Sequence, residues 1–182
     1  AVTGVQTCAL PICGNLMGSR NDLVTEREAI KASWSQVDVV LQRRADMIPN
    51  LVETVKGFAK QEQSVIDSVT QARAAMMGAK SPSEKIAADG QISSALGRLF
   101  VMVESYPNLK SDQNFLRLQD ELTGTENRIA VERRKYNEVV NKYNTDVQLF
   151  PKNIAASLFN FQTEDAYFKA DAASKEAPKV KF

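Results

Sequence analysis

The sequence predicts an all-α fold, an antiparallel bundle of three to four long helices with coiled-coil-like packing. Apolar residues recur in alternating steps of four and three, capping and stopping residues divide the chain at a few points, and no segment shows the period-two alternation of a strand. The first stripe keeps a heptad register for six repeats and consists of Ile30, Trp34, Val37, Leu41, Arg44, Ile48, Leu51, Val55, Phe58, Glu62, Val65, Val69, Ala72 and Met76.

Pro49 lies inside this first stripe, and a proline within a helix removes a backbone donor and clashes with the preceding turn. We expect the first helix either to be bent at Pro49 while keeping its buried face, or to reverse in a tight turn near Asp46 to Ile48. The unbroken register favours the bend, whereas the Pro49-Asn50 pair and the restriction that a proline places on Ile48 favour the reversal.

Capping signals predict the limits of the first helical region. Thr25 to Glu28 has the S/T-x-x-E form of a capping box, so we expect a helix to start there and its stripe to continue to about Met77. Gly78 should end this region. Ser81-Pro82-Ser83-Glu84 then combines a cap, a first-turn proline and a reciprocal acceptor, and predicts the next start.

The remaining helices follow from the same signals. Tyr106-Pro107-Asn108 predicts a turn, Ser111-Asp112 opens the last long helix, and Pro151 closes it. The stripe of this last helix consists of Phe115, Leu118, Leu122, Thr125, Ile129, Glu132, Tyr136, Val139, Tyr143, Asp146 and Phe150. We therefore expect a bundle over residues 24–158, with a short helix over Lys152 to Leu158, and an irregular C-terminal strap and tail over 159–182.

The N-terminal residues have a different origin in our interpretation. Val2 to Ile12 reads V-T-G-V-Q-T-C-A-L-P-I and resembles the in-frame translation of a common DNA-sequencing adapter, so we exclude residues 1–12 from the fold and expect the true N-terminus to be missing. Residues 13–23 are expected to form a flexible tether. Cys13-Gly14-Asn15 resembles the start of a mature bacterial lipoprotein, which makes Cys13 a candidate lipid anchor, although it can equally be an incidental thiol.

Composition excludes several functional classes. The chain has 23 basic and 22 acidic residues without long charged blocks, so nothing indicates nucleic acid or an acidic substrate. It has no His, which removes the commonest general base and metal ligand. We expect no catalytic residues, no metal site and no cofactor. No run of 18 apolar residues exists, so the sequence as given contains no transmembrane helix.

Charged groups at seam positions are the first candidates for function. Arg44, Glu62, Glu132 and Asp146 occupy such positions, where charges usually fix register and partner choice. A buried carboxylate could instead act as an acid or base, and an enzyme or enzyme accessory would use Glu62, Glu126 and Glu132.

Two polar surfaces are the second candidates. Interaction-face candidates are Arg43, Arg44, Asp46, Asn50, Tyr136, Asn137, Tyr143 and Asn144, and the repeated Tyr-Asn pairs can alternatively form a packing surface bonded across helices. A local basic excess, which could bind anionic lipid or be ion-paired in solvent, consists of Arg128, Arg133, Arg134, Lys135 and Lys142.

Five segments carry a family resemblance: Trp34 to Glu62 (W-S-Q-V-D-V-V-L-Q-R-R-A-D-M-I-P-N-L-V-E-T-V-K-G-F-A-K-Q-E), Ala72 to Ala74 (A-R-A), Glu104 to Lys110 (E-S-Y-P-N-L-K), Thr125 to Asn144 (T-E-N-R-I-A-V-E-R-R-K-Y-N-E-V-V-N-K-Y-N) and Phe150-Pro151. Together they resemble the LemA family over about Asn21 to Phe182. The resemblance implies a bacterial helical bundle held at the membrane by an N-terminal helix or a lipidated Cys, with the bundle outside the cytoplasm. We expect a non-enzymatic interaction or scaffold protein of the cell envelope, with an envelope protein as partner.

Overall fold

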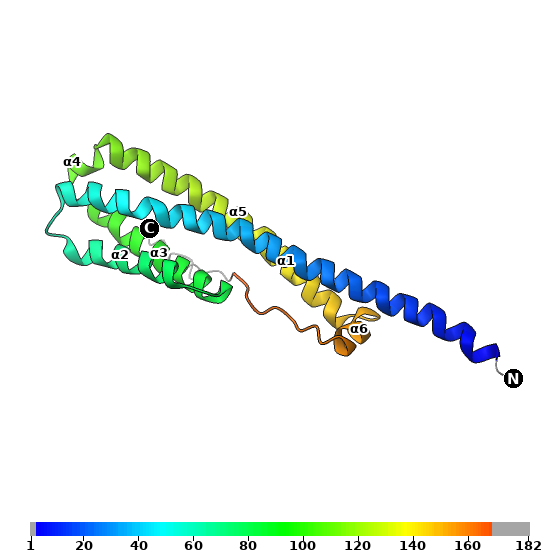
Figure 1. Ribbon diagram of the computed structural model, residues 1–182. Coiled ribbons are helices and arrows are strands. Elements are labelled where there is room, and N and C mark those ends of the chain that lie inside the picture. The colour runs from blue at the N-terminus through cyan, green and yellow to red at the C-terminus, as the bar shows by residue number, and fades with distance from the viewer. Residues whose placement is uncertain (1–2, 169–182) are drawn as a thin grey trace, which may run out of the picture. The chain divides into compact units, whose positions relative to one another are not determined.

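The computed structural model describes residues 3–168, and the side chains from Gly14 onward. These residues form six helices and no strand, so the predicted all-α class is confirmed (Figure 1). The helices are α1 Thr3–Phe58, α2 Gln63–Gly78, α3 Pro82–Val103, α4 Pro107–Lys110, α5 Gln113–Gln148 and α6 Lys152–Leu158. None of them, within the residues described, is both long and apolar enough to cross a membrane.

The chain divides into two compact units, and the two longest helices contribute to both. Of the described residues, unit 1 contains 3–37 and 132–167, and unit 2 contains 38–131 and Phe168. Unit 1 therefore holds the first part of α1, the last part of α5, and α6. Unit 2 holds the rest of α1 and α5 together with α2, α3 and α4.

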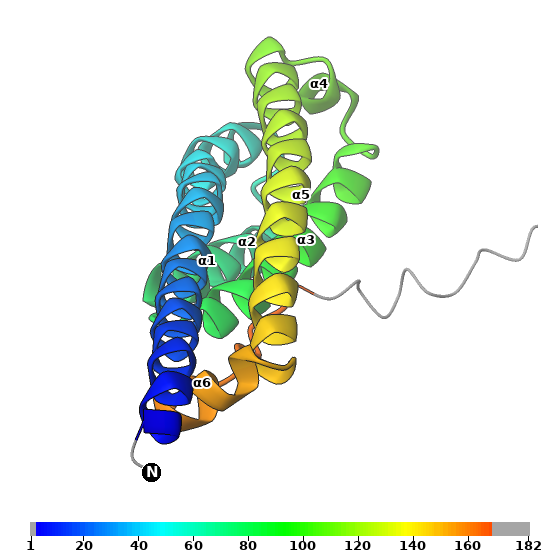
Figure 2. The ribbon, with the colours of Figure 1, turned by 90° about the vertical axis from the view of Figure 1, so that its right-hand side faces the viewer.

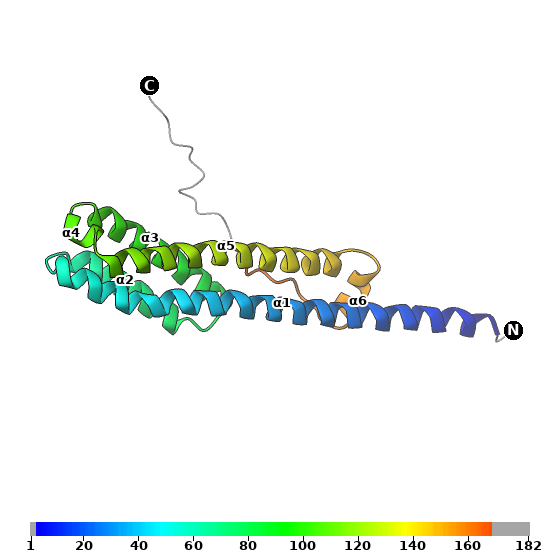
Figure 3. The ribbon, with the colours of Figure 1, turned by 90° about the horizontal axis from the view of Figure 1, so that it is seen from above.

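In unit 2, α2 runs antiparallel to the second part of α1. Gln42 near the start of that part contacts Met77 at the end of α2, whereas Ala45 is bonded to Arg73 one turn earlier in α2. Figure 3 shows α2 and α3 side by side in this unit, and Arg98 of α3 donates to Ser68 of α2. The buried side chains of this core include Leu41, Ile48, Leu51, Val55, Ile66, Val69, Ile92, Leu99, Phe115 and Leu122.

Pro49 does not reverse the chain, because α1 continues through it to Phe58. Proline has no N–H, so the carbonyl of Ala45, four residues earlier, lacks its usual helical donor. The side chain of Arg73 replaces it, with Nε donating to the Ala45 oxygen at 3.1 Å. The alternative of a turn near Asp46 to Ile48 is therefore wrong, and an arginine from α2 completes the hydrogen bonding of α1 at this point.

The reversal occurs instead at residues 59–62, inside the region that we expected to be one helix from Glu26 to Met77. The turn carries the polar Lys60-Gln61-Glu62, and the amide of Glu62 bonds the carbonyl of Ala59 at 3.1 Å. Phe58 is 43% exposed, which corrects its assignment to the buried stripe. The heptad register did not indicate this break, because α1 and α2 each place an apolar stripe in the core.

The boundary before α3 is the one that sequence signals described best. Ser81 accepts a bond from the amide of Glu84, and the Glu84 carboxylate accepts one from the amide of Ser81, so the predicted capping box is confirmed with Pro82 in the first turn. The turn predicted at Tyr106-Pro107-Asn108 contains the short helix α4. Asp112 then accepts from the amide of Phe115 and so caps α5.

Unit 1 packs the first part of α1 against the last part of α5, with α6 turning back beside them (Figure 2). Thr25 does not begin a helix, because α1 is already helical and the hydroxyl of Thr25 bonds back to the carbonyl of Asn21. Residues 13–23, expected to be a flexible tether, are also helical, and Leu23 is fully buried. Trp34 and Tyr136 make an edge-on contact between the two long helices.

Candidate functional site

Arg44 occupies the centre of unit 2 and is the seam charge with the most contacts. Its side chain is 6% exposed, and Nη1 donates to Asp89 Oδ1 at 2.8 Å and to Ser93 Oγ at 3.0 Å, both on α3. Nη2 lies 2.8 Å from Glu126 Oε2 on α5, in ion-pair contact without the alignment of a hydrogen bond. One guanidinium therefore joins α1, α3 and α5.

The chemistry of this centre follows from its burial. Desolvation lowers the pKa of Arg44, and the charge of Glu126 opposes that shift, so the guanidinium keeps its charge at neutral pH. Asp89 is completely buried, whereas the Glu126 side chain is 41% exposed. Because a lone buried charge is very costly, Arg44 and Asp89 depend on each other. Asp89 is not among the residues that the sequence analysis identified as candidates.

A pocket of about 290 Å³ opens beside this centre, between α3 and α5. Arg44 and Glu126 lie at its polar side. Its other lining residues are Ser93, Leu96, Gly97, Phe100, Leu122, Thr123 and Asn127. The two charged residues at this pocket are paired with each other.

The predicted face around Arg43 is divided by the structure. Arg43, Asp46 and Asn50 are exposed on unit 2, while Arg44 is buried and belongs to the core. The exposed residues follow the four-three spacing from Val39, which is 68% exposed, so they share one outward stripe of α1. We call Val39, Arg43, Asp46 and Asn50 the outer stripe. It is a helix surface with an apolar end and charges of both signs.

The second predicted face is covered rather than open. Tyr136 and Tyr143 are 1% and 2% exposed, and burial raises the pKa of Tyr136 to about 12, with Glu164 and Tyr167 adding to the shift. The pKa of Tyr143 is raised as well, again chiefly through burial. The alternative of a packing surface therefore describes these tyrosines, which are not available to an outside partner.

Residues 159–168, which we call the strap, cover this face. Asn144 donates from Nδ2 to the carbonyl of Glu164 and to Tyr167 Oη, each at 2.8 Å, and its Oδ1 accepts from the amide of Glu164 at 2.8 Å. Tyr143 Oη donates to the carbonyl of Gln162 at 2.9 Å. Asn137 lies one helix repeat earlier and is half-buried. The Tyr-Asn pairs thus hold the chain's own C-terminal segment.

The other seam carboxylates are each engaged separately. Glu62 accepts from Tyr106 Oη at 2.7 Å, which raises the pKa of that tyrosine. Glu132 pairs with Lys135 at 2.8 Å. Asp146 is bonded by Lys152 at 2.6 Å and by Lys142 at 3.1 Å. The described residues hold no cluster suited to a metal ion.

The basic excess on α5 is partly neutralised. Lys135 is paired with Glu132, and Lys142 contacts both Glu26 and Asp146. Of the predicted basic residues, Arg128 and Arg134 are exposed. The ion-paired alternative therefore describes Lys135 and Lys142.

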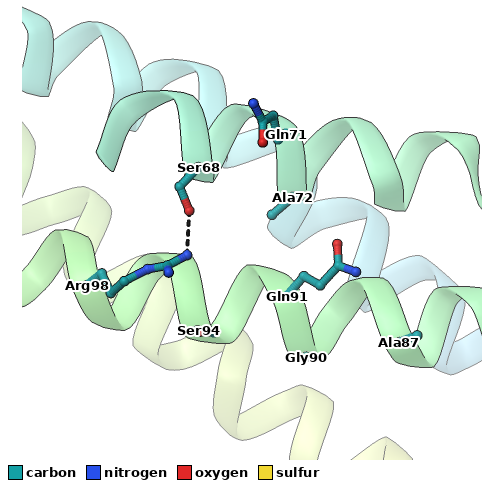
Figure 4. Close-up of a pocket in the computed structure, with 8 residues that line it drawn as sticks. All are labelled: Ser68, Gln71, Ala72, Ala87, Gly90, Gln91, Ser94 and Arg98. Carbon is teal, nitrogen blue, oxygen red and sulfur yellow. Dashed lines mark hydrogen bonds between the residues drawn. The ribbon is translucent and has the colours of Figure 1, made fainter. Parts of the chain in front are cut away.

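A hollow between α2 and α3 has a volume of about 480 Å³ (Figure 4). Small and polar side chains line it, and its one charged residue, Arg98, donates to Ser68 Oγ at 2.5 Å. Such a lining offers hydrogen bonds and close approach but no acid, base or nucleophile pair. The candidate lipid anchor Cys13 lies in α1, and its side chain is outside the part that the structure describes.

Comparison with known proteins identifies relatives of this chain. The model of the LemA family matches residues 33–182. The chain is 28% identical to magnetosome proteins MamQ 1 and MamQ 2 of Paramagnetospirillum magneticum over 84% of its length, and spans 65% of those relatives. It is 24% identical to protein LemA of Metamycoplasma hominis, over 90% of this chain and 73% of that protein.

Proposed function

Because the chain belongs to the LemA family, we propose that it is a membrane-tethered protein of the bacterial cell envelope that presents a helix surface to a protein partner and is not an enzyme. The tether is a lipid on Cys13 or a spanning helix in the preceding segment, and the bundle lies on the extracytoplasmic side. Its partner is another envelope protein.

The outer stripe is the observation that carries this proposal. It is exposed over about three turns of a helix, whose opposite side is fixed by Arg44, Ile48 and Leu51 in the core of unit 2. A rigid helix loses little conformational freedom on binding. A partner can contact its exposed stripe through side chains that lie three and four residues apart along the helix. Val39 supplies an apolar anchor, and Arg43 with Asp46 supplies orientation through charge.

Site-specific crosslinking in cells tests this proposal. A photoreactive residue at Arg43 and, separately, at Asn50 should give the same adduct, because the two positions lie on one stripe. Matched controls at Arg117 and Asp120, exposed on α5 in the same unit, should not give it. Arg43→Glu should reduce the adduct formed from position 50. No adduct at the outer stripe, or equal adducts at the controls, would contradict the proposal.

The enzyme alternative has weaker support in the geometry. Glu62, Glu126 and Glu132 each contact their own polar partner, and the pocket beside Glu126 contains a paired carboxylate. Replacing each with Gln separates the two ideas. A catalytic role requires loss of the cellular phenotype with unchanged helicity and melting, whereas a structural role requires loss of phenotype and loss of stability together.

A further inference from the structure

Exposed apolar side chains gather where α5 ends and α6 begins. Five of the twelve large apolar side chains that are exposed in the described part of the chain lie between residues 149 and 159, so they form a cluster rather than scattered positions. They are Leu149, Phe150, Ile154, Leu158 and Phe159, with exposures of 57, 78, 50, 66 and 37%. We call these five residues the α6 patch. Isolated exposed apolar residues are ordinary, but a contiguous group marks a binding surface.

Helix α6 is apolar on both sides. Ala155 and Ala156 are buried against unit 1, while Ile154 and Leu158, four residues apart, point away from it. Phe150 precedes Ile154 by four residues and is the most exposed member of the patch. The small inner residues let α6 pack closely, and the large outer side chains leave half or more of their surface exposed to solvent.

A hollow lies inside the same surface. It has a volume of about 320 Å³ and is lined by Leu16, Phe150, Pro151 and Ile154, with Asn15 and Ser19 from α1. Its lining is mostly hydrocarbon with two neutral polar side chains. A space of this kind suits an alkyl chain more than a charged metabolite.

Arg20 is the basic side chain that contacts the patch. Residues 14–21 and 147–163 contain no Asp or Glu, and their charged residues are Arg20 and Lys152. The Arg20 guanidinium lies 5.4 Å from the centre of the Phe159 ring. Lys152 is paired with three carboxylates, Asp22, Glu26 and Asp146, so its charge is balanced within the protein. An apolar surface with an exposed arginine at its edge is complementary to the headgroup region of an anionic bilayer.

We propose that the α6 patch is a lipid-binding surface that enters the headgroup region of an anionic bilayer. Phenylalanine and aliphatic side chains supply the buried apolar area, and Arg20 lies at the level of the phosphates. This surface differs from the basic stretch of α5. That stretch carries exposed arginines, but it has fewer exposed large apolar side chains than the α6 patch. The inference deepens the proposed membrane association, and it places the end of unit 1 that contains α6 on the bilayer.

Vesicle flotation with the 182-residue chain tests this surface without any lipid anchor. The chain should float with vesicles of phosphatidylcholine and phosphatidylglycerol at 3:1, and binding should weaken as salt rises. The Phe150→Ser/Ile154→Ser/Leu158→Ser variant should bind at least tenfold more weakly. The matched control Val101→Ser/Leu116→Ser removes exposed apolar side chains of unit 2, 74 and 44% exposed, and should bind as the parent does.

Two further measurements identify the occupant. Arg20→Gln should weaken binding to the anionic vesicles severalfold and leave the weak binding to phosphatidylcholine alone unchanged. Phe150→Trp should add a fluorescence component that shifts to the blue on vesicle addition, whereas a fluorophore left in water would not shift. Circular dichroism of every variant must match the parent.

Three results would overturn the proposal. They are no flotation at low salt, equal loss of flotation in the Val101→Ser/Leu116→Ser control, and self-association that the patch variant abolishes while flotation is unchanged. The last outcome, measured by sedimentation velocity, would assign the patch to a second copy of the chain. A native N-terminus without any anchor would contradict the proposed tether, yet it would leave these vesicle results standing, so the two ideas fail separately.

Discussion

Arg73 Nε on α2 donates a hydrogen bond of 3.1 Å to the carbonyl oxygen of Ala45, the acceptor that Pro49 leaves without its backbone donor in α1. A helix interrupted by proline normally compensates with water or with a kink. Here a side chain from the neighbouring helix fills the position. The same contact holds α2 in its antiparallel alignment along α1.

Removing this donor should lower the free energy of unfolding more when Pro49 is present than when it is absent. We expect Arg73→Met to lower the free energy of unfolding by about 1–2 kcal/mol, since a partly buried carbonyl loses its charged donor. In a Pro49→Ala background the new amide can bond Ala45, and the same substitution should cost clearly less. Urea unfolding of the four proteins measures this coupling. Equal costs in both backgrounds would show that Arg73 acts independently of the proline.

The buried pair at the centre of unit 2 gives a second prediction. Arg44→Met should destabilise the protein by about 3–5 kcal/mol, because Asp89 is then a buried carboxylate without its cation. Arg44→Met combined with Asp89→Leu should recover much of that loss, since apolar side chains of similar volume can replace a buried pair. Thermal and urea unfolding provide the values. A double variant that is as unstable as the sum of the single variants would refute the interdependence of the two charges.

The sequence predicted the fold class and the Ser81 cap well because both depend on local patterns that tertiary packing reinforces. It located the chain reversal wrongly, because the heptad register continues across residues 59–62 and no Gly or Pro lies within that turn. It also placed Arg44 on an outside face. The apolar stripe does contain Arg44, yet its partner Asp89 is 45 residues away, and only the folded bundle reveals that the two charges meet.

The C-terminal strap gives a third prediction. Asn144 makes three hydrogen bonds to Glu164 and Tyr167, so Asn144→Ala should release the strap and expose the face that carries Tyr136 and Tyr143. Amide hydrogen exchange at residues 162–167 should become at least tenfold faster, which corresponds to about 1.4 kcal/mol of lost local stability. The control Asn141→Ala changes an exposed residue on the same helix and should leave exchange there unchanged. Equal exchange in both variants would show that Asn144 does not hold the strap.

Tyr136 gives a prediction for alkaline solution. Its pKa is raised to about 12 by burial and by Glu164 and Tyr167, so the folded protein favours the neutral phenol. The corresponding stability is fully present below the unfolded pKa of about 10 and is lost as pH rises from there toward 12. Tyr136→Phe, which cannot ionise, should show a shallower loss of stability over that range, and absorbance at 295 nm should lose its last-titrating component. An unchanged alkaline slope would contradict this assignment.

The ion network of unit 1 gives the corresponding prediction for acid. Two lysines and two carboxylates alternate, because Lys142 and Lys152 each contact both Glu26 and Asp146. The hydrogen bond from Lys152 lowers the pKa of Asp146, with Glu26 and Lys142 adding to the effect. A depressed carboxyl pKa stabilises the folded protein above the unfolded value of about 3.9, and that stability is lost as pH falls below it.

Asp146→Asn should therefore lower stability at neutral pH by up to about 1 kcal/mol, the usual scale for partly exposed ion pairs. It should also flatten the decline of stability between pH 5 and 2, which urea midpoints at a series of pH values can measure. Asp120→Asn removes an exposed carboxylate of unit 2 and serves as the control. If both variants keep the parental acid slope, the Asp146 carboxylate does not supply the pH dependence. If only Asp146→Asn flattens it, the ion network is what fixes the end of α5 to α1 and α6, and with it the position of the α6 patch.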